Sequence, residues 1–249
     1  MNSLPMLIIH YHLFKNAGTS VDAMLKANFG DRWATQEFET NDPSRNKMLV
    51  EQFLRDHPEI SALSSHTALL PAPQLAERAV FPIIFVRHPL LRLASAYRFE
   101  VKQDADTFGA RLAKRTDFPG YVEELLLQNE PGQARNFQAG RLAMNFPDNE
   151  GARFNRALRA VDALPFVGLV EAYDRSVDRL ARMLEPHFPE FEPLIVQENV
   201  SGGAAHDVEG RLAEIRQQLG NDLFLRLNDA NREDIAIFES VRERYRQPA

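Results

Sequence analysis

The sequence predicts a three-layer α/β/α protein with a central parallel sheet and a helical elaboration, and two observations predict it. Short apolar runs of strand length, such as Met6 to His12 and Phe81 to Val86, alternate with stretches whose apolar residues recur at helical spacing. The first run leads through a tight glycine-containing loop into a helical stretch, Thr19 to Asn28. This alternation favours parallel strands covered on both faces, with binding sites beyond their carboxyl ends.

The other elements follow from the same spacing rules. Pro82 is expected at the start of its strand, and Pro89 in the first turn of the next helix. We expect one domain over residues 1–249, with a helical insertion at about 105–163 and a helical C-terminal tail at about 206–249. The remaining strands are predicted at Ile60 to Ser64 and Phe166 to Val170, and the remaining helical stretches at Lys47 to Asp56, Leu90 to Val101, Thr107 to Leu164 with turns near Pro119, Pro131 and Pro147, Ala172 to Leu184, and Val208 to Tyr245.

Composition narrows the classes of function. The 249 residues are 44% hydrophobic and 26% charged, as in an ordinary folded protein. The absence of cysteine excludes disulfides and thiolate metal sites, and it fits a reducing compartment. No apolar run reaches the length of a membrane helix, and the first residues lack the basic region and cleavage site of a signal peptide. We therefore expect a cytoplasmic protein without stable membrane insertion.

The charge of the chain is uneven. The net charge of −6 and the pI of about 5.7 argue against a nucleic-acid partner. From Arg87 to Arg115, however, seven basic residues stand against three acidic ones. This local excess of positive charge indicates an anion site, although a solvated helix face explains it as well. The residues give no indication of the oligomeric state.

The first motif reads HLFKNAGTS, from His12 to Ser20, between a strand and a helix. N–H groups at a helix N-terminus are unpaired and carry partial positive charge. Small residues at positions 17 and 18 let an anion approach, Lys15 adds a full charge, and Thr19 and Ser20 add hydroxyl donors. The motif therefore predicts a phosphate cradle, with a plain turn as the alternative. It is not a Walker A loop, because its lysine precedes the glycine.

The second motif reads RHPLLRLASAY, from Arg87 to Tyr97. Arg87 ends the strongest predicted strand, and an arginine leaving a buried strand needs a carboxylate or phosphate partner. Ser95 lies eight residues further on, inside the following helix. A serine in that position could also bond to its own helix backbone and have no role in binding.

Together the two motifs resemble those of the sulfotransferases that depend on 3'-phosphoadenosine-5'-phosphosulfate (PAPS). The closest resemblance is to the branch with the Golgi carbohydrate sulfotransferases, including the heparan sulfate 2-O-sulfotransferases, and many bacterial relatives. That family has the forms HxPKxGGTS and RxPxxRxxSxY. Two further stretches resemble it in order, Val167 to Leu184 and Asn199 to Ser201. The chain differs from the family pattern at three positions. Phe14 stands where the family usually has proline, Asn16 where a hydroxyl residue is common, and His88 where Asp or Asn is frequent.

The resemblance implies a P-loop-like fold and transfer of a sulfuryl group from PAPS to an acceptor hydroxyl, which leaves 3'-phosphoadenosine-5'-phosphate (PAP). Lys15 would stabilise the leaving phosphate oxygen, where negative charge develops. Arg87 and Ser95 would hold the 3'-phosphate, which distinguishes PAPS from most adenine nucleotides. No metal is expected, since the group transferred from PAPS carries one charge fewer than that of ATP and a lysine can serve where a kinase needs magnesium. The 5'-phosphate would be held by Asn16, Ala17, Gly18, Thr19 and Ser20, and the segment with Asn199 and Ser201 would close over the nucleotide.

The acceptor hydroxyl needs a general base, and His66 is the candidate. An imidazole is largely neutral near pH 7, as a base must be. His66 follows a predicted strand and lies between the two anion motifs, where the 2-O-sulfotransferases have a catalytic histidine. The alternative is a loop histidine on the surface. The acceptor itself stays open: a glycan, a lipid headgroup and a small molecule are all compatible with an acidic chain.

Three other groups of residues could carry chemistry. His10 and His12 share one face of a strand, but we see no third metal ligand nearby and favour a structural role. Gln138, with Asn136 and Arg135, resembles a family segment near the acceptor cleft, although the polarity of a helix surface explains it nearly as well. Trp33 is most simply a core or cleft-wall residue.

Two other functions compete with sulfuryl transfer. A P-loop kinase or nucleotide hydrolase would need magnesium ligands and an ATP-type loop, and neither is evident in the sequence. A non-catalytic nucleotide-binding protein with the same fold would not need the catalytic side chains. The presence of Lys15, His66, Arg87 and Ser95 favours the enzyme.

Overall fold

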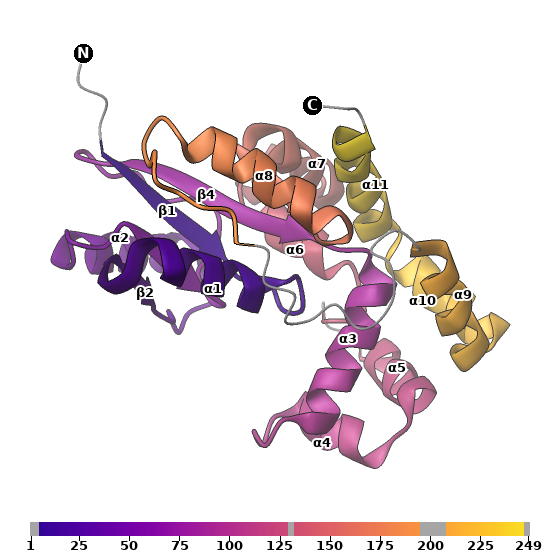
Figure 1. Ribbon diagram of the computed structural model, residues 1–249. Helices are drawn as coiled ribbons and strands as arrows, with labels where there is room; N and C mark the ends of the chain where they lie inside the picture. Colours follow the sequence, from indigo (N-terminus) through magenta and orange to yellow (C-terminus); the bar gives the residue numbers. More distant parts are fainter. Residues whose placement is uncertain (1–4, 129–131, 195–207, 247–249) are drawn as a thin grey trace.

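The computed structural model describes residues 5–128, 132–194 and 208–246. Its centre is a five-stranded sheet in the order β2-β3-β1-β4-β5, and every recorded pairing is parallel. Helices lie on both sides of this sheet, which confirms the predicted α/β class (Figure 1). The strands are β1 (Met6–Tyr11), β2 (Trp33–Thr35), β3 (Ala62–Ser65), β4 (Ala79–Val86) and β5 (Phe166–Leu169).

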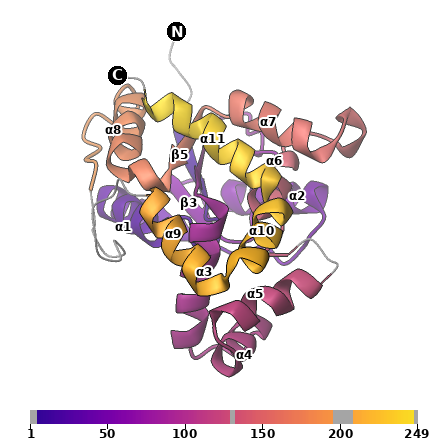
Figure 2. The ribbon, with the colours of Figure 1, turned by 90° about the vertical axis from the view of Figure 1, so that its right-hand side faces the viewer.

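The helices form two layers and a lobe. On one face of the sheet lie α1 (Gly18–Phe29) and α8 (Tyr173–Leu184), and on the other lie α2 (Pro43–Asp56), α6 (Phe137–Ala143), α7 (Arg153–Ala163) and α11 (Arg232–Arg246). The lobe, next to the carboxyl ends of the strands, contains α3 (Pro89–Lys102), α4 (Phe108–Arg115), α5 (Phe118–Leu127), α9 (Val208–Leu219) and α10 (Asn221–Ala230) (Figure 2). Short 3₁₀ turns follow at η1 (Gly30–Arg32), η2 (Asp148–Glu150) and η3 (Val170–Ala172).

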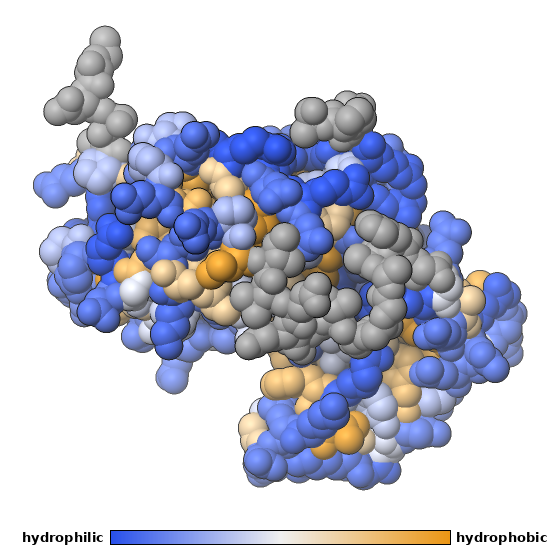
Figure 3. Space-filling model, viewed as in Figure 1, coloured by the Kyte–Doolittle hydropathy of each residue, from blue (hydrophilic) through white to orange (hydrophobic). Residues whose placement is uncertain are grey.

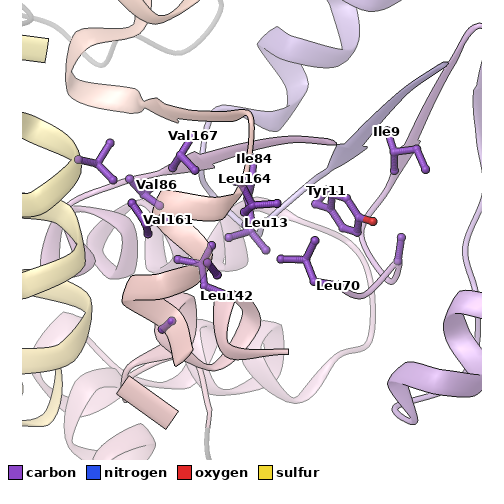
Figure 4. Close-up of a cluster of buried hydrophobic side chains, with 14 of the residues drawn as sticks. Ile9, Tyr11, Leu13, Leu70, Ile84, Val86, Leu142, Val161, Leu164 and Val167 are labelled. Carbon is purple, nitrogen blue, oxygen red and sulfur yellow. The ribbon is translucent and has the colours of Figure 1, made fainter. Parts of the chain in front are cut away.

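The sheet is buried on both faces because alternate residues of each strand point to opposite layers. Ile8 of β1 packs into the cluster under α1 and α8, whereas its neighbour Ile9 packs into the cluster under α6 and α7. Figure 4 shows the second cluster, in which side chains of β1, β4 and β5 meet Leu142 of α6 and Val161 of α7. These cores fix the sheet, and the strand ends that carry the motifs are fixed with it.

Most predicted elements are present, with two differences. The strand β2 was not predicted, because three residues at a sheet edge are too short for a periodicity to be seen. The helix α2 begins at Pro43 rather than Lys47, since Asp42 accepts hydrogen bonds from the N–H groups of Ser44 and Arg45 and so caps it.

The position predicted for Pro82 is wrong. It lies in the interior of β4, where it pairs with Ile9 of β1. The pairing of β4 with β5 begins one residue later, at Ile83, so β4 has a strand on only one side at the proline.

The surface of the molecule is mostly polar in the view of Figure 3, with apolar patches on the lobe of α3, α4 and α5. Phe99, Val101 and Phe108 are the large apolar side chains that α3, α4 and their connection expose. Among the described residues, no helix is both long and apolar enough to cross a membrane.

The topology brings the two sequence motifs together. After β1 the chain adds β2 and β3 on one side of β1, then returns to add β4 and β5 on the other. The loop after β1 and the loop after β4 therefore leave neighbouring strands at the same edge of the sheet. In open parallel sheets this reversal point is where ligands bind.

Candidate active site

The loop after β1 has the backbone of an anion cradle. Lys15 and Ala17 both take the left-handed conformation, with φ of 64° and 61°, which non-glycine residues rarely adopt. Helix α1 starts directly afterwards, at Gly18. Within the described part of the chain, the N–H groups of Ala17, Gly18 and Thr19 have no recorded hydrogen-bond acceptor. Three unpaired donors at a helix N-terminus suit a phosphate.

Gly18 is required by a close approach inside this cradle. A Cβ at position 18 would lie 1.9 Å from two atoms of the His12 ring, so the ring would have to move from the place where Asp22 and His66 hold it. The ring of His12 therefore occupies the space that a side chain at position 18 would need, and the loop wraps against it.

Lys15 points from the loop toward the helical lobe. It is half-buried, and its Nζ lies 4.4 Å from the ring centroid of Phe99 on α3. Partial burial lowers the pKa of Lys15, and the positive charges of Arg87 and Arg98 lower it further. A lysine among other cations is a strong attractor for a multiply charged anion.

Arg87 is buried at the end of β4, as predicted. Its Nη1 donates to the backbone carbonyl of Lys15 at 3.0 Å, which links the two motifs directly. Its Nε lies 3.9 Å from Oε1 of Glu171 and has no hydrogen-bond partner among the described residues. Burial lowers the pKa of Arg87 to about 10 against the opposing effect of Glu171, so the guanidinium stays charged at neutral pH. A buried charge with an unpaired donor is poised to bind an anion.

Ser95 lies on α3 and is half-buried. Among the described residues its hydroxyl has no hydrogen-bond partner. The alternative from the sequence, a bond from Ser95 to its own helix backbone, is therefore not present. Arg98 lies three residues further on and thus on the same helix face. Phe99, four residues after Ser95 and beside it on the helix surface, contacts Nζ of Lys15, which places this part of α3 next to the loop after β1.

A further arginine joins the site from a distant part of the chain. The charge of Arg211 on α9 lowers the pKa of both Arg87 and Arg98, after the effect of their burial. The charges of Lys15, Arg87, Arg98 and Arg211 are therefore coupled, with Lys15 and Arg87 at the edge of the sheet. Glu171, on the turn after β5, is the buried acid beside them; its Oε1 also accepts the N–H of His88 at 3.1 Å.

The side chain of Asn16 is buried and forms its hydrogen bonds inside the protein. Its backbone N–H donates to Leu13, and its amide nitrogen donates to the carbonyl of Phe85 and to Oε1 of Gln138. All its N–H donors are therefore used, and the side chain shapes the loop instead of facing the cradle. Gln138 is fully buried, so the explanation of this residue as helix-surface polarity is wrong.

His66 lies directly after β3, and its ring is held by a carboxylate. The Nδ1 atom of His66 is 2.8 Å from Oε1 of Glu37, and the side chain of His66 is 55% exposed. Glu37 also accepts the N–H groups of His66 and Thr67 and the hydroxyl of Thr67. Burial opposes ionisation of Glu37, but these hydrogen bonds outweigh it and hold its pKa below the usual range.

His10 and His12 have the third neighbour that was not expected from the sequence, Asp22 of α1. The two Nδ1 atoms lie 2.8 and 2.9 Å from different oxygens of the Asp22 carboxylate, and these three side chains could in principle hold a metal. The imidazole rings, however, are stacked within 20° of parallel. Because the lone pairs lie in the ring planes, they point side by side rather than at one point. A carboxylate with two oxygens suits this arrangement better than one ion.

The pair of His10 and His12 is in contact with His66, the predicted general base, through ring stacking. The rings of His12 and His66 are stacked with centroids 3.9 Å apart. The Asp22 carboxylate is partly buried, which disfavours its charge, yet its hydrogen bonds with His10 and His12 hold its pKa far below the usual range. Asp22 therefore stays ionised and orients the His12 ring through its hydrogen bond, and the His12 ring in turn packs against the ring of His66.

Arg87 meets the loop after β1 through its bond to the Lys15 carbonyl, and His66 meets it through stacking on His12. Ser95 lies on α3, whose Phe99 ring contacts Lys15, whereas the Asn16 side chain is turned away from the cradle. Asn199 and Ser201 lie outside the described residues. Four side chains that complete the site were not predicted. Asp22, Glu37 and Arg211 belong to no motif, and Glu171 lies in the family-like stretch Val167 to Leu184 without having been singled out as a site residue. The one signal available was for Asp22, a carboxylate at the fifth position of the helix after the loop.

The fold and the site define an α/β protein with two anion-binding motifs at one edge of a parallel sheet. A sequence model of the sulfotransferase family matches residues 6–239, and the chain therefore belongs to the sulfotransferase family. It is also 37% identical, over 249 residues, to a protein of Archaeoglobus fulgidus named only as uncharacterized; the match covers 97% of this chain and 98% of that protein. The family predicted from the motifs is confirmed, whereas the branch stays a prediction.

Proposed function

We propose that this protein transfers a sulfuryl group from PAPS to the hydroxyl of an acceptor. One observation carries the proposal. An anion cradle and a buried arginine leave neighbouring strands and are tied by a 3.0 Å hydrogen bond, and the described residues offer no partner for three N–H groups of the cradle or for Nε of the arginine. Two anion sites at this edge fit a nucleotide with phosphate at both its 5' and 3' positions. When bound, PAPS supplies the activated sulfuryl group.

The residues divide between the two ends of such a nucleotide. The N–H groups of residues 17–19 and the hydroxyls of Thr19 and Ser20 are suited to the 5'-phosphate. Arg87 and Ser95 are suited to the 3'-phosphate, because an arginine fork and a hydroxyl without another partner complement phosphate oxygens. Arg98 and Arg211 raise the positive potential around them.

Lys15 is the residue that we assign to the leaving oxygen. Its ammonium group would neutralise the charge that develops on the 5'-phosphate as the sulfuryl group departs, without a metal ion. The stacking on Phe99 restricts the side chain before the reaction, so that less orientation is needed during it.

His66 is the residue that we assign as general base, with Glu37 as its positioning residue. The hydrogen bond at Nδ1 fixes the tautomer in which that nitrogen carries the proton, and the lone pair then lies on Nε2. Nε2 would accept the proton of the acceptor hydroxyl as the oxygen attacks. The ionised Glu37 carboxylate would stabilise the imidazolium that forms.

The acceptor must approach an exposed histidine beside a carboxylate. Glu37 is 45% exposed at the side chain, and its negative charge disfavours a densely sulfated polysaccharide at this point. We therefore propose a neutral glycan, a lipid headgroup or a small molecule as acceptor.

The test is a transfer assay with radiolabelled PAPS and a panel of hydroxyl acceptors, in the presence of EDTA. Appearance of label on an acceptor, together with release of PAP, is the expected result. Transfer of phosphate from ATP in a parallel assay with magnesium in place of EDTA, without sulfuryl transfer from PAPS, would support the kinase alternative and contradict the proposal.

A further inference from the structure

One buried amide contacts both anion motifs. Gln138 of α6 has no exposed surface, and its Oε1 accepts hydrogen bonds from the backbone N–H of Arg87 and the amide of Asn16, both at 2.8 Å. Its Nε2 donates to the backbone carbonyl of Arg87, also at 2.8 Å. The side chain thus bonds to Arg87 on both sides of the residue, as a neighbouring strand would.

This arrangement replaces a strand where the sheet has none. Arg87 directly follows the last residue of β4, and β5 pairs with β4 only as far as Val86. Without a partner, the N–H and carbonyl of Arg87 would be buried and unsatisfied, which is costly. Gln138 satisfies both groups, and in doing so it fixes the point from which the Arg87 side chain leaves.

The same amide reaches the loop after β1 through Asn16. The Asn16 nitrogen lies 2.6 Å from the carbonyl of Phe85 and 2.8 Å from Gln138, so it connects β4, α6 and the loop. Asn16 stands between the two left-handed residues, Lys15 and Ala17. A strained backbone needs such anchoring, because it would otherwise relax to a commoner conformation.

Gln138 is in turn held by the C-terminal helix. The carboxylate of Asp234, buried on α11, accepts the N–H groups of Gln138 and Ala139 at the start of α6. In return, the side chain of Asn136 accepts the N–H groups of Glu233 and Asp234 at the start of α11. The two helices thus cap each other, and Gln138 leaves α6 from this fixed junction.

We propose that Gln138 is a positioning residue that couples the two anion-binding motifs, with Asp234 as its anchor. The proposal rests on the proposed function, since it gives this network a purpose in binding a nucleotide with two phosphates. It predicts that losing the amide weakens the 3'-phosphate contact more than the 5'-phosphate contact, because Arg87 loses both of its backbone partners, whereas Asn16 keeps its bond to the Phe85 carbonyl.

The experiment is a calorimetric titration of the full chain with PAP and with AMP, for wild type and Gln138→Met. Methionine keeps the volume of glutamine and removes all its hydrogen bonds. We expect PAP to bind about tenfold to a hundredfold more weakly, and AMP to be affected less, so that the preference for PAP over AMP shrinks. Asp234→Asn, a milder change, is expected to move the preference in the same direction by a smaller factor.

Asn46→Ala is the matched control. Asn46 is also a fully buried amide on a helix, and it bridges the carbonyl of Thr67 and the N–H of Leu69 away from both motifs. It should lower the melting temperature and leave the preference for PAP unchanged. If Gln138→Met and Asp234→Asn behave like Asn46→Ala, the network is merely structural and the inference is overturned. If the wild type binds no PAP, the proposed function falls and the inference falls with it.

Discussion

The two corners of the site, around Arg87 and around His66, are built in opposite ways. At the first corner the charged side chain is 11% exposed, and its backbone is bonded by Gln138 on both sides. At the second corner the ring of His66 is 55% exposed and is held by one carboxylate that is itself 45% exposed. The first corner is rigid and closed, and the second is open to solvent.

The difference follows from what each corner must do. A group that holds the same anion in every turnover gains from burial, since charge interactions strengthen away from water, although the lowered pKa of Arg87 shows the cost. A base that meets a separate acceptor must stay accessible. The comparison therefore predicts that changes at the Arg87 corner act on nucleotide binding, whereas changes at the His66 corner act on turnover.

The largest effect is expected at the open corner. His66→Ala should lower kcat by about 10²–10⁴-fold and leave PAP affinity unchanged, because a base contributes to the transition state alone. Glu37→Gln should lower kcat by roughly tenfold to a hundredfold, since the amide cannot stabilise the imidazolium. Steady-state kinetics measures the change in kcat, and a titration with PAP measures the change in affinity separately. His57→Ala, a histidine at the end of α2, is the control; a loss of PAP affinity in His66→Ala would break the comparison.

Lys15 should come next. Lys15→Met should lower kcat by about 10²–10³-fold, because one electrostatic contact to the developing charge is lost. Its effect on PAP affinity should be smaller, as the loop N–H groups remain. Lys102→Met, at the exposed end of α3, gives the matched control. Equal losses in kcat and in PAP affinity would mean that Lys15 serves binding rather than the departure of the sulfuryl group.

A smaller effect on binding alone is expected for Ser95. Ser95→Ala should weaken PAP by about fivefold to tenfold, the net value of one typical hydrogen bond, and leave AMP unaffected. Calorimetry with both nucleotides measures this difference. If AMP weakened by the same factor, Ser95 would be acting on the helix α3 and not on a 3'-phosphate.

The smallest effect concerns the strained loop. Ala17→Gly should raise the free energy of unfolding by about 0.5–1 kcal/mol, because glycine removes the penalty of φ at 61° but is more flexible when unfolded. Thermal unfolding without ligand should show a rise of about 2 °C. A fall in melting temperature would mean that the Ala17 methyl group makes packing contacts worth more than the strain.

The sequence predicts the closed corner better than the open one. Arg87 and the β1 loop follow strong apolar strands, and their local patterns suffice to place them at strand ends. The anchors of these residues are long-range: Gln138 lies 51 residues from Arg87, and Glu37 lies 29 residues from His66. Spacing within an element cannot reveal such contacts, because they depend on which strands become neighbours. The same reason hides Asp22 and Arg211, whose partners belong to other elements.

The most direct test of the account is calorimetric binding of PAP, compared with AMP and with ATP plus magnesium, for wild type and Arg87→Ala. The account predicts that the wild type prefers PAP without metal, and that Arg87→Ala loses this preference by reducing PAP affinity about tenfold to a hundredfold. Equal or tighter binding of ATP with magnesium, or an Arg87→Ala variant that keeps its preference for PAP, would contradict it.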